Sequence, residues 1–252
     1  MKRITWAMLG LILLPLAACD DDEASTTVGL SLSSRAVVAT LRAEGDLEIT
    51  RARLVLEEIE LETDDDGTGS SSSDGLLSED DPNDDSSGYE YETGPTLLEL
   101  NLSGEVNEVM VANVPAGLYD ELEFEVDTVD DDEPEDRSAM SDPAFADFVG
   151  EIRYSVIIEG RYDGGAGIED FTFRSDLSAT QEQPLVPPLV LEAGDGSANL
   201  TLVIDTTTWF QDGSGGSLDP GDPANASQIE NNIQASIDVF EDDDEDGYED
   251  ED

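Results

Sequence analysis

The chain has 252 residues, of which 63 are Asp or Glu and only 10 are Lys or Arg, so its formal net charge is −53. A charge this negative repels nucleic acids and anionic lipids, which excludes both as partners, and it favours cations, a basic partner of the cell envelope or life in high salt. The chain has no histidine and a single cysteine, which excludes Ser-His-Asp and Cys-His catalysis and leaves an apolar core, without disulfides, to hold the fold.

Residues 1–18 have the pattern of a bacterial lipoprotein signal peptide. Lys2 and Arg3 form a short basic segment, and the uncharged apolar run that follows is too short for a comfortable membrane span. The run closes on the lipobox Leu-Ala-Ala-Cys at 16–19, where small residues admit the peptidase and the thiol takes the lipid. We therefore expect Cys19 to become the lipidated first residue of an envelope lipoprotein, held by its acyl chains on the periplasmic face of a membrane or at the cell surface.

Residues 19–25 are expected to form an acidic tether, and residues 26–210 a β-sandwich domain. Apolar and polar residues alternate through most of this domain, which is the period of half-buried strands. The alternating segments are 28–32, 47–61, 98–102, 106–111, 122–126, 152–162, 171–176, 184–191 and 200–205. The phase slips within 47–61, which predicts a bulge or two joined strands. About eight to ten short strands, without a strong helix before residue 220, favour a sandwich over a parallel fold.

Two acidic segments interrupt the strands. Residues 64–94 contain few side chains that could enter a core, and we expect a disordered insertion there. Residues 128–142 are expected to form a second acidic loop. A short helix follows at 143–148, with Asp142 as its N-cap.

Residues 211–240 are expected to form a loop and one C-terminal amphipathic helix. Ser227 and Glu230 have the spacing of a capping box. One apolar face follows, made by Ile229, Ile233, Ile237 and Phe240. This single stripe predicts a helix that packs against the sandwich and does not enter a membrane.

The acidic tail, residues 241–252, contains a candidate Ca²⁺ loop. Asp242, Asp244 and Asp246 would stand at positions 1, 3 and 5 of the loop, with Gly247 at the sharp turn. The remaining ligands would be the backbone carbonyl of Tyr248 and, through water, Asp250. The pattern resembles the calcium loops of EF-hands and thrombospondin-type repeats, but the twelfth position, a bidentate Glu in EF-hands, would fall after Asp252. The alternative is a solvated acidic tail.

The order of the pieces resembles a group of uncharacterised bacterial lipoproteins built on one transthyretin-like or carboxypeptidase-regulatory-like sandwich. Besides the lipobox, the segments that carry the resemblance are Pro115–Tyr119, Gly160–Gly164, Phe171–Phe173, Leu200–Asp205 and Trp209-Phe210. The resemblance implies a mainly β fold, an antiparallel Greek-key β-sandwich, and it supplies no catalytic residue.

The leading functional hypothesis is a non-enzymatic envelope lipoprotein, a binding or structural module with Ca²⁺ as its candidate cofactor. One alternative is a carbohydrate-binding module, in which Trp209, Phe210, Tyr89 and Tyr91 would stack on a sugar ring. Against it, Trp209 and Phe210 lie between a strand and a helix, where they would close the open end of the sandwich. A third candidate is a hydrolase that uses paired carboxylates, although nothing in the sequence marks one pair above another.

Overall fold

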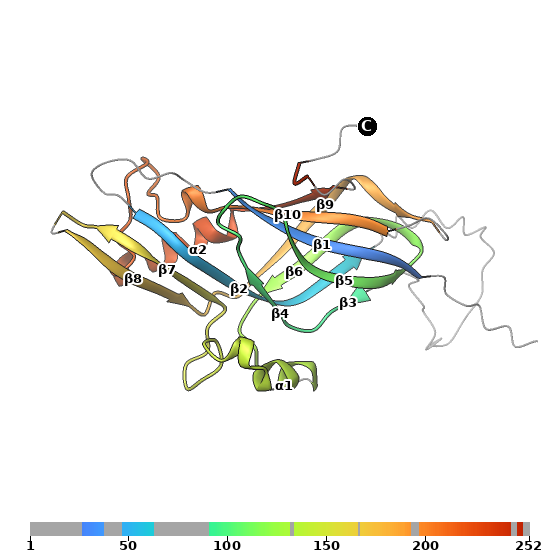
Figure 1. Ribbon diagram of the computed structural model, residues 1–252, viewed down its shortest axis with the longest axis horizontal. Coiled ribbons are helices and arrows are strands. Elements are labelled where there is room, and N and C mark those ends of the chain that lie inside the picture. Colours follow the sequence, from blue (N-terminus) through green and yellow to red (C-terminus); the bar gives the residue numbers. More distant parts are fainter. Residues whose placement is uncertain are drawn as a thin grey trace, which may run out of the picture.

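Two β-sheets pack face to face in the computed structural model, which describes residues 27–37, 47–62, 91–131, 134–165, 167–192, 197–242 and 246–248 (Figure 1). The strands are β1 (Thr27–Val37), β2 (Leu47–Glu62), β3 (Tyr91–Glu92), β4 (Thr96–Glu99), β5 (Asn107–Pro115), β6 (Gly117–Val126), β7 (Val156–Asp163), β8 (Ile168–Ser175), β9 (Ala179–Leu191), β10 (Ser197–Asp205) and β11 (Ile237–Glu241). The helices are α1 (Pro134–Ser141) and α2 (Ala226–Gln234), with short 3₁₀ helices at Pro143–Phe145, Thr206–Thr208 and Pro223–Asn225.

The smaller sheet has the order β11-β10-β1-β5, and the larger sheet has the order β8-β7-β2-β6-β9, with β3 and β4 also paired to β2. The strand pairs are antiparallel except for β1 and β10, which run parallel from Gly29 opposite Ser197 to Val37 opposite Asp205. The expectation of a mainly β sandwich with a short C-terminal helix is confirmed.

The core lies between the two sheets and follows the alternation read from the sequence. In β6 the side chains of Leu122, Phe124 and Val126 are buried, while the glutamates between them point to the outer face of the larger sheet. Tyr119 is fully buried, and its hydroxyl donates to the carbonyl of Pro115 at 2.8 Å, which fixes the turn between β5 and β6.

The expected phase slip within 47–61 is a pair of irregularities in one long strand. Against β7, the pairing of β2 shifts between Ile49 and Arg51, and against β6 it shifts between Leu56 and Glu58. Each shift leaves one extra residue in β2, as in a β-bulge. The prediction of a bulge is therefore confirmed, and the alternative of two joined strands is wrong, because Leu47–Glu62 form a single strand.

Two expectations about helices need correction. Residues 128–142 contain a helix, α1, because this segment packs over an apolar patch on the outer face of the larger sheet. That patch is a second, smaller core that includes Val55, Phe145, Phe148 and Ile157. The expected cap at Asp142 is confirmed, since its carboxylate accepts the N–H of Ala144 at 2.8 Å, but the helix it begins is a 3₁₀ helix of three residues.

The C-terminal helix ends earlier than its apolar stripe suggested. It stops at Gln234, and Ile237–Glu241 form the edge strand β11 against β10. Ile237 and Val239 are both buried in the common core, because alternate residues of a strand point to the same side. They do not reach the core as one face of a helix. The backbone of β10 thereby gains a partner on its open side, which outweighs continuation of the helix.

Trp209 and Phe210 close one end of the sandwich. Both are buried, and the indole N–H of Trp209 donates to Ser236 Oγ at 2.7 Å. The ring of Phe210 packs edge-on against Phe171 and Phe173, with centroids 5.4 and 6.0 Å away. Within the described ranges, neither helix is long and apolar enough to cross a membrane.

Candidate cation-binding sites

The outer face of β2 and β6 carries glutamates directly opposite glutamates. The register of the two strands pairs Glu58 with Glu125, Glu60 with Glu123, and Glu62 with Glu121. We call this row the glutamate ladder. Like charges directly opposite each other destabilise a sheet, so the ladder favours either protons or bound cations.

Two members of the ladder, Glu123 and Glu125, have raised pKa values. Burial raises the pKa of Glu123 above its usual value, and the charges of Glu62 and Glu182 add to the effect. Burial also raises the pKa of Glu125, with further contributions from Asp127 and Glu58. Both shifts have the sign expected where carboxylates lose water and face one another.

Glu57 lies at the end of the ladder, where β2 bulges. It is the extra residue between Leu56, opposite Val126, and Glu58, opposite Glu125. Bulges change the direction of a side chain and are common beside functional sites. Here the bulge brings Glu57 to the outer face, beside the chain that leaves β6 for α1.

Five carboxylates converge at this point, and we call them the Glu57 cluster. They form two groups that share Glu57, and within each group the ligand oxygens lie within 4.8 Å of one another. One group contains Glu57, Glu125 and Asp127, and the other contains Glu57, Asp130 and Asp136. Asp136, on α1, is buried. The helix that the sequence did not predict therefore supplies part of the cluster.

Within the cluster, the pKa of Glu57 is strongly raised. Burial raises the pKa of Glu57 to about 7, and the charges of Asp127, Asp136, Glu125 and Asp130 add to the shift. Burial and the neighbouring charges all raise the pKa of Glu57, because both disfavour the ionised carboxylate. A divalent cation would relieve the same repulsion that the proton relieves.

The donor set suits a hard cation. Carboxylate oxygens are the preferred ligands of Ca²⁺, at bond lengths of about 2.3–2.6 Å, so oxygens on opposite sides of one ion stand about 5 Å apart. The spacing within each group of the Glu57 cluster agrees with that limit. The residues are therefore able to hold Ca²⁺ with water completing the shell.

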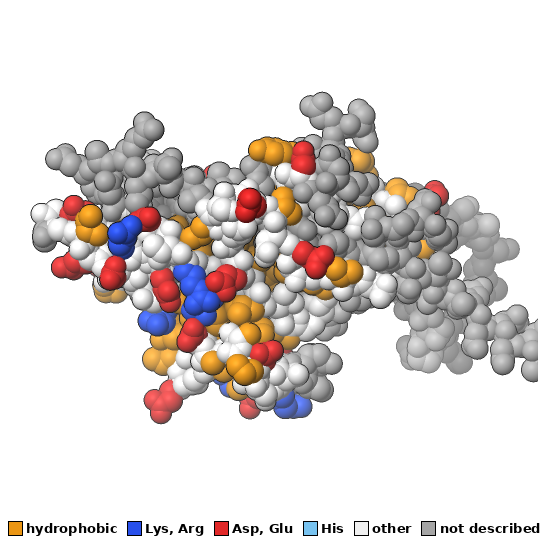
Figure 2. All heavy atoms as spheres, in the orientation of Figure 1, with side chains coloured by type: hydrophobic (Ala, Val, Ile, Leu, Met, Phe, Trp, Pro, Cys, Tyr) orange, Lys and Arg blue, Asp and Glu red, His pale blue; other side chains and the backbone are white. Residues whose placement is uncertain are grey.

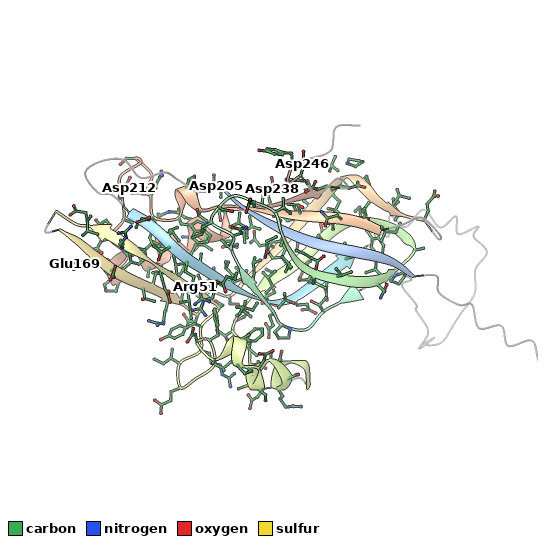
Figure 3. All side chains as sticks on the ribbon, in the orientation of Figure 1. Arg51, Glu169, Asp205, Asp212, Asp238 and Asp246 are labelled. Atoms are coloured by element: carbon green, nitrogen blue, oxygen red, sulfur yellow. The ribbon has the colours of Figure 1, made fainter. Side chains whose placement is uncertain are left out.

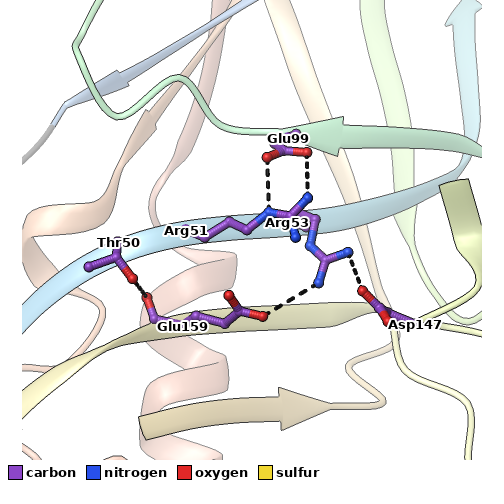
Figure 4. A network of polar contacts seen from close by, with 6 residues as sticks. All are labelled: Thr50, Arg51, Arg53, Glu99, Asp147 and Glu159. Atoms are coloured by element: carbon purple, nitrogen blue, oxygen red, sulfur yellow. Dashed lines mark hydrogen bonds and ion pairs between the residues drawn. The ribbon is translucent and has the colours of Figure 1, made fainter. Parts of the chain in front are cut away.

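Arginines neutralise the carboxylates on the other half of the outer face of β2, around Arg51 and Arg53 (Figure 4). Arg51 donates from Nε and Nη2 to the two carboxylate oxygens of Glu99, both at 2.9 Å. Arg53 is buried and lies 2.8 Å from Asp147 and 3.8 Å from Glu159. On the face drawn in Figure 2, basic side chains lie among acidic ones in the left part of the view and at its lower edge.

The predicted calcium loop begins at a buried carboxylate. The side chain of Asp242 is fully buried, and its Oδ2 accepts the Thr201 hydroxyl at 2.7 Å and the Gly247 N–H at 2.9 Å. Its Oδ1 accepts the N–H of Asp246 at 3.0 Å. Gly247 has a φ of 78°, the left-handed conformation that the sharp turn of a calcium loop requires.

The other expected ligands of this loop are only partly placed. Asp246 and Tyr248 are exposed, and Asp246 lies near the C-terminal end of the trace, above the smaller sheet (Figure 3). Asp246 Oδ1 accepts the N–H of Tyr248 at 2.9 Å. Asp244 and Asp250 lie outside the described residues, as does Cys19, so the full ligand set and the lipidation site stay predictions.

The sugar-stacking aromatics are not available in the way the carbohydrate hypothesis required. Trp209 and Phe210 are buried in the core, so neither ring can lie flat against a ligand. Their other interpretation, closure of the sandwich, is confirmed. Tyr89 lies outside the described residues, and so does the segment 63–90 that contains most of the expected insertion.

The Glu57 cluster was not predicted from the sequence. The alternation of β6 indicated one wet, acidic face, and the phase slip in β2 indicated a bulge. The register of the strand pairing could not be read from the sequence, and it is the register that places the acidic face of β2 against that of β6. A search for acidic alternation on two strands, with a slip in one of them, is the signal that could have found the site.

Comparisons with known proteins add little. No family model matches the chain, and no curated protein matches it. Among solved structures, the chain is similar to MbnP from Methylosinus trichosporium, with a TM-score of 0.36 and 16% sequence identity, over 86% of this chain and 98% of that one. A likeness this low carries no argument about fold or function.

Proposed function

We propose that this protein is a lipid-anchored, non-enzymatic module of the cell envelope that binds Ca²⁺. The anchor is proposed from the lipobox that ends at Cys19 and from the acidic tether that follows it. The same pattern supports membership of the uncharacterised lipoproteins with a single sandwich domain. An increase in mass by the acyl groups on Cys19, abolished in Cys19→Ala, is the result expected from mass spectrometry of the protein made in bacteria.

One observation carries the proposal of Ca²⁺ binding: two groups of three carboxylates share the bulged Glu57, and the separations within each group suit one ion. The raised pKa of Glu57 supports it, because the repulsion that retains a proton also favours a divalent cation. Ca²⁺ fits this site better than softer metals, since all the donors are carboxylate oxygens.

The loop at Asp242 is proposed as a second Ca²⁺ site, with Asp242, Asp244, Asp246, Tyr248 and Asp250 as its ligands. The support is the fixed turn: two backbone N–H groups bind the buried Asp242, and Gly247 takes the conformation that the loop needs. Because Asp242 already accepts three hydrogen bonds, the exposed Asp246 would contribute more of the direct coordination.

Thermal unfolding with Ca²⁺ separates these two sites. Sites of the extracellular type bind in the range of about 0.1–1 mM, so 10 mM Ca²⁺ should stabilise the protein by about 1.4–2.7 kcal/mol per site. Glu57→Gln should remove the part of the increase in Tm that comes from the Glu57 cluster. Asp246→Asn should remove the part that comes from the loop at Asp242. Glu169→Gln, at the exposed start of β8, is the matched control and should leave the response unchanged. Equal responses in Mg²⁺ and Ca²⁺, or in all variants, would contradict specific binding.

High-salt adaptation is the competing explanation of the acidic surface. It predicts that any salt raises Tm at equal ionic strength, because screening weakens repulsion between carboxylates without regard to the cation. A Tm response to Ca²⁺ that exceeds the response to NaCl at equal ionic strength therefore distinguishes the two. The carboxylate-based hydrolase is tested separately: hydrolysis of a glycoside panel that Glu57→Gln abolishes would replace the present proposal.

A further inference from the structure

An uncharged apolar protrusion interrupts the acidic surface at one end of the sandwich. Residues 183–191 of β9 contain no charged side chain. Within them Val186 is 77% exposed and Val190 is 59% exposed, and Leu118 of β6, directly opposite Val190, is 55% exposed. We call these three residues the apolar tip. Exposed apolar groups gathered in this way mark surfaces that meet another apolar phase.

The backbone makes the tip project. Tyr119 pairs with Leu189, and Glu121 pairs with Pro184, so residues 185–188 of β9 stand opposite a single residue of β6. The additional residues leave the plane of the sheet as a bulge. Leu185 is buried and fixes the base of the bulge, while Val186 and the two prolines after it are exposed.

The tip lies at the end of the sandwich where the tether enters. Thr27, the first residue of β1, stands opposite Pro115, and Gly117, just after that turn, stands opposite Leu191 (Figure 1, right). Cys19 is eight residues before Thr27, so the tether spans at most about 29 Å when fully extended. This end is therefore held near the bilayer whenever Cys19 carries lipid.

The opposite end is out of reach of such a short tether. Strand β2 runs along the sandwich from Leu47, opposite Tyr162, to Glu62, opposite Glu121. Its 16 residues span about 50 Å at the usual rise of a strand. Ile168, in the β7–β8 hairpin at the far end, is 67% exposed and offers a matched apolar side chain.

We propose that the apolar tip inserts into the headgroup region of the membrane that holds the lipid anchor, so that the sandwich stands on its tethered end. This inference rests on the proposed lipidation of Cys19. The occupant is a zwitterionic lipid surface, because the net charge of the chain opposes an anionic one. Apolar groups that enter such an interface reach a depth of about 5–10 Å, and anchoring at two points restricts the orientation of the domain.

The test uses the full lipidated protein in phosphatidylcholine vesicles. Cys19 is the one cysteine of the chain and its thiol carries the lipid, so Val186→Cys, Val190→Cys and Ile168→Cys each give a single labelling position. A fluorophore at Val186→Cys or Val190→Cys should be quenched by brominated lipid at least about fivefold more than at Ile168→Cys, since quenching requires contact at the depth of the interface.

The outcomes separate this inference from the proposed function. Acylated protein with equal quenching at all three positions would overturn the insertion of the tip and leave the anchor standing. Absence of the acyl mass on Cys19 would overturn both. Self-quenching between labels at Val186→Cys without quenching by lipid would show a second copy of the chain on the tip, and would also overturn the proposal. Selective quenching that weakens in Val186→Asp, with the label at Val190→Cys, would support it.

Discussion

The two halves of the outer face of β2 respond to the same acidic surroundings in opposite ways. In the first half, Arg51 and Arg53 meet Glu99, Asp147 and Glu159, and the segment around α1 covers the strand. In the second half, glutamates of β2 face glutamates of β6, and the row ends at the Glu57 cluster. One strand therefore carries a region where arginines pair with carboxylates and a region where carboxylates face one another.

The difference shows that net charge does not describe how a protein of this kind is stabilised. Arg53 lowers the pKa of Asp147 below its usual range by donating to it, and Arg51 does the same to Glu99. Around Glu57 the shift has the opposite sign. In the first half arginine holds carboxylates in their charged form, whereas in the second half burial and neighbouring carboxylates favour protonation of Glu57.

Removing the buried arginine is expected to have the largest effect on this contrast. Arg53 is 3% exposed, and its guanidinium lies 5.2 Å from the centre of the Phe148 ring. Arg53→Ala would leave a cavity beside Phe148 and remove the donor to the carboxylate of Asp147, so we expect a loss of about 2–3 kcal/mol in the free energy of unfolding. Urea denaturation measures it.

Arg51→Ala is the matched control for that experiment. Its ion pair with Glu99 is partly exposed on both sides, and such pairs contribute at most about 1 kcal/mol. Similar losses in the free energy of unfolding for Arg53→Ala and Arg51→Ala would show that burial of Arg53 adds nothing to its contribution. That result would contradict the contrast between the two halves of β2.

Removing one charge from the other half should have the opposite sign. Without Ca²⁺ at pH 8, Glu57→Gln is expected to stabilise the fold by a few tenths to about 1 kcal/mol, since it relieves repulsion while keeping the shape of the side chain. With 10 mM Ca²⁺ the same variant should be less stable than the wild type. A variant that is destabilised under both conditions would indicate a structural hydrogen bond at Glu57 instead of repulsion.

The pH dependence should follow the same carboxyl. Between its usual value of 4.5 and its value of about 7 in the fold, Glu57 binds a proton in the folded protein that the unfolded chain releases. The contribution of this group to stability is therefore present at pH 4.5 and decreases as the pH rises to about 7. Thermal unfolding without Ca²⁺ should show this slope in the wild type and a smaller one in Glu57→Gln. Equal slopes would assign the proton to another group.

The smallest effect is expected from salt at the ladder itself. Raising NaCl should increase the Tm of the wild type, and less so that of Glu123→Gln, because screening acts on repulsion that the variant has already reduced. Glu123 lies between Glu60 and Glu182 in the sheet, so one substitution weakens two cross-strand pairs. An unchanged response in the variant would show that these glutamates already hold counterions tightly.

Much of the sandwich could be predicted because its strands have one dry face and one wet face. Leu122, Phe124 and Val126 gave the orientation of β6, and the slip before Ile59 gave the bulge in β2. The turn at 115–117 also followed from its proline and glycine. These features are local, and each depends on residues close together in the chain.

The Glu57 cluster and two elements could not be predicted, because they depend on partners distant in sequence. α1 forms over the apolar patch around Val55 and Ile157, although its own residues are strongly polar. β11 forms because β10 offers an unpaired edge. The Glu57 cluster needs both the helix and the register between β2 and β6, so neither acidic run alone indicated where the ligands meet.

The parallel pairing of β1 with β10 has a consequence for how the protein is made. Leu30 of β1 stands opposite Ala198 of β10, so the smaller sheet cannot close until most of the chain is available. Contacts between such distant segments slow folding. Strand β1, the first strand of the sandwich, therefore lacks one of its two neighbours until residues 197–205 are available.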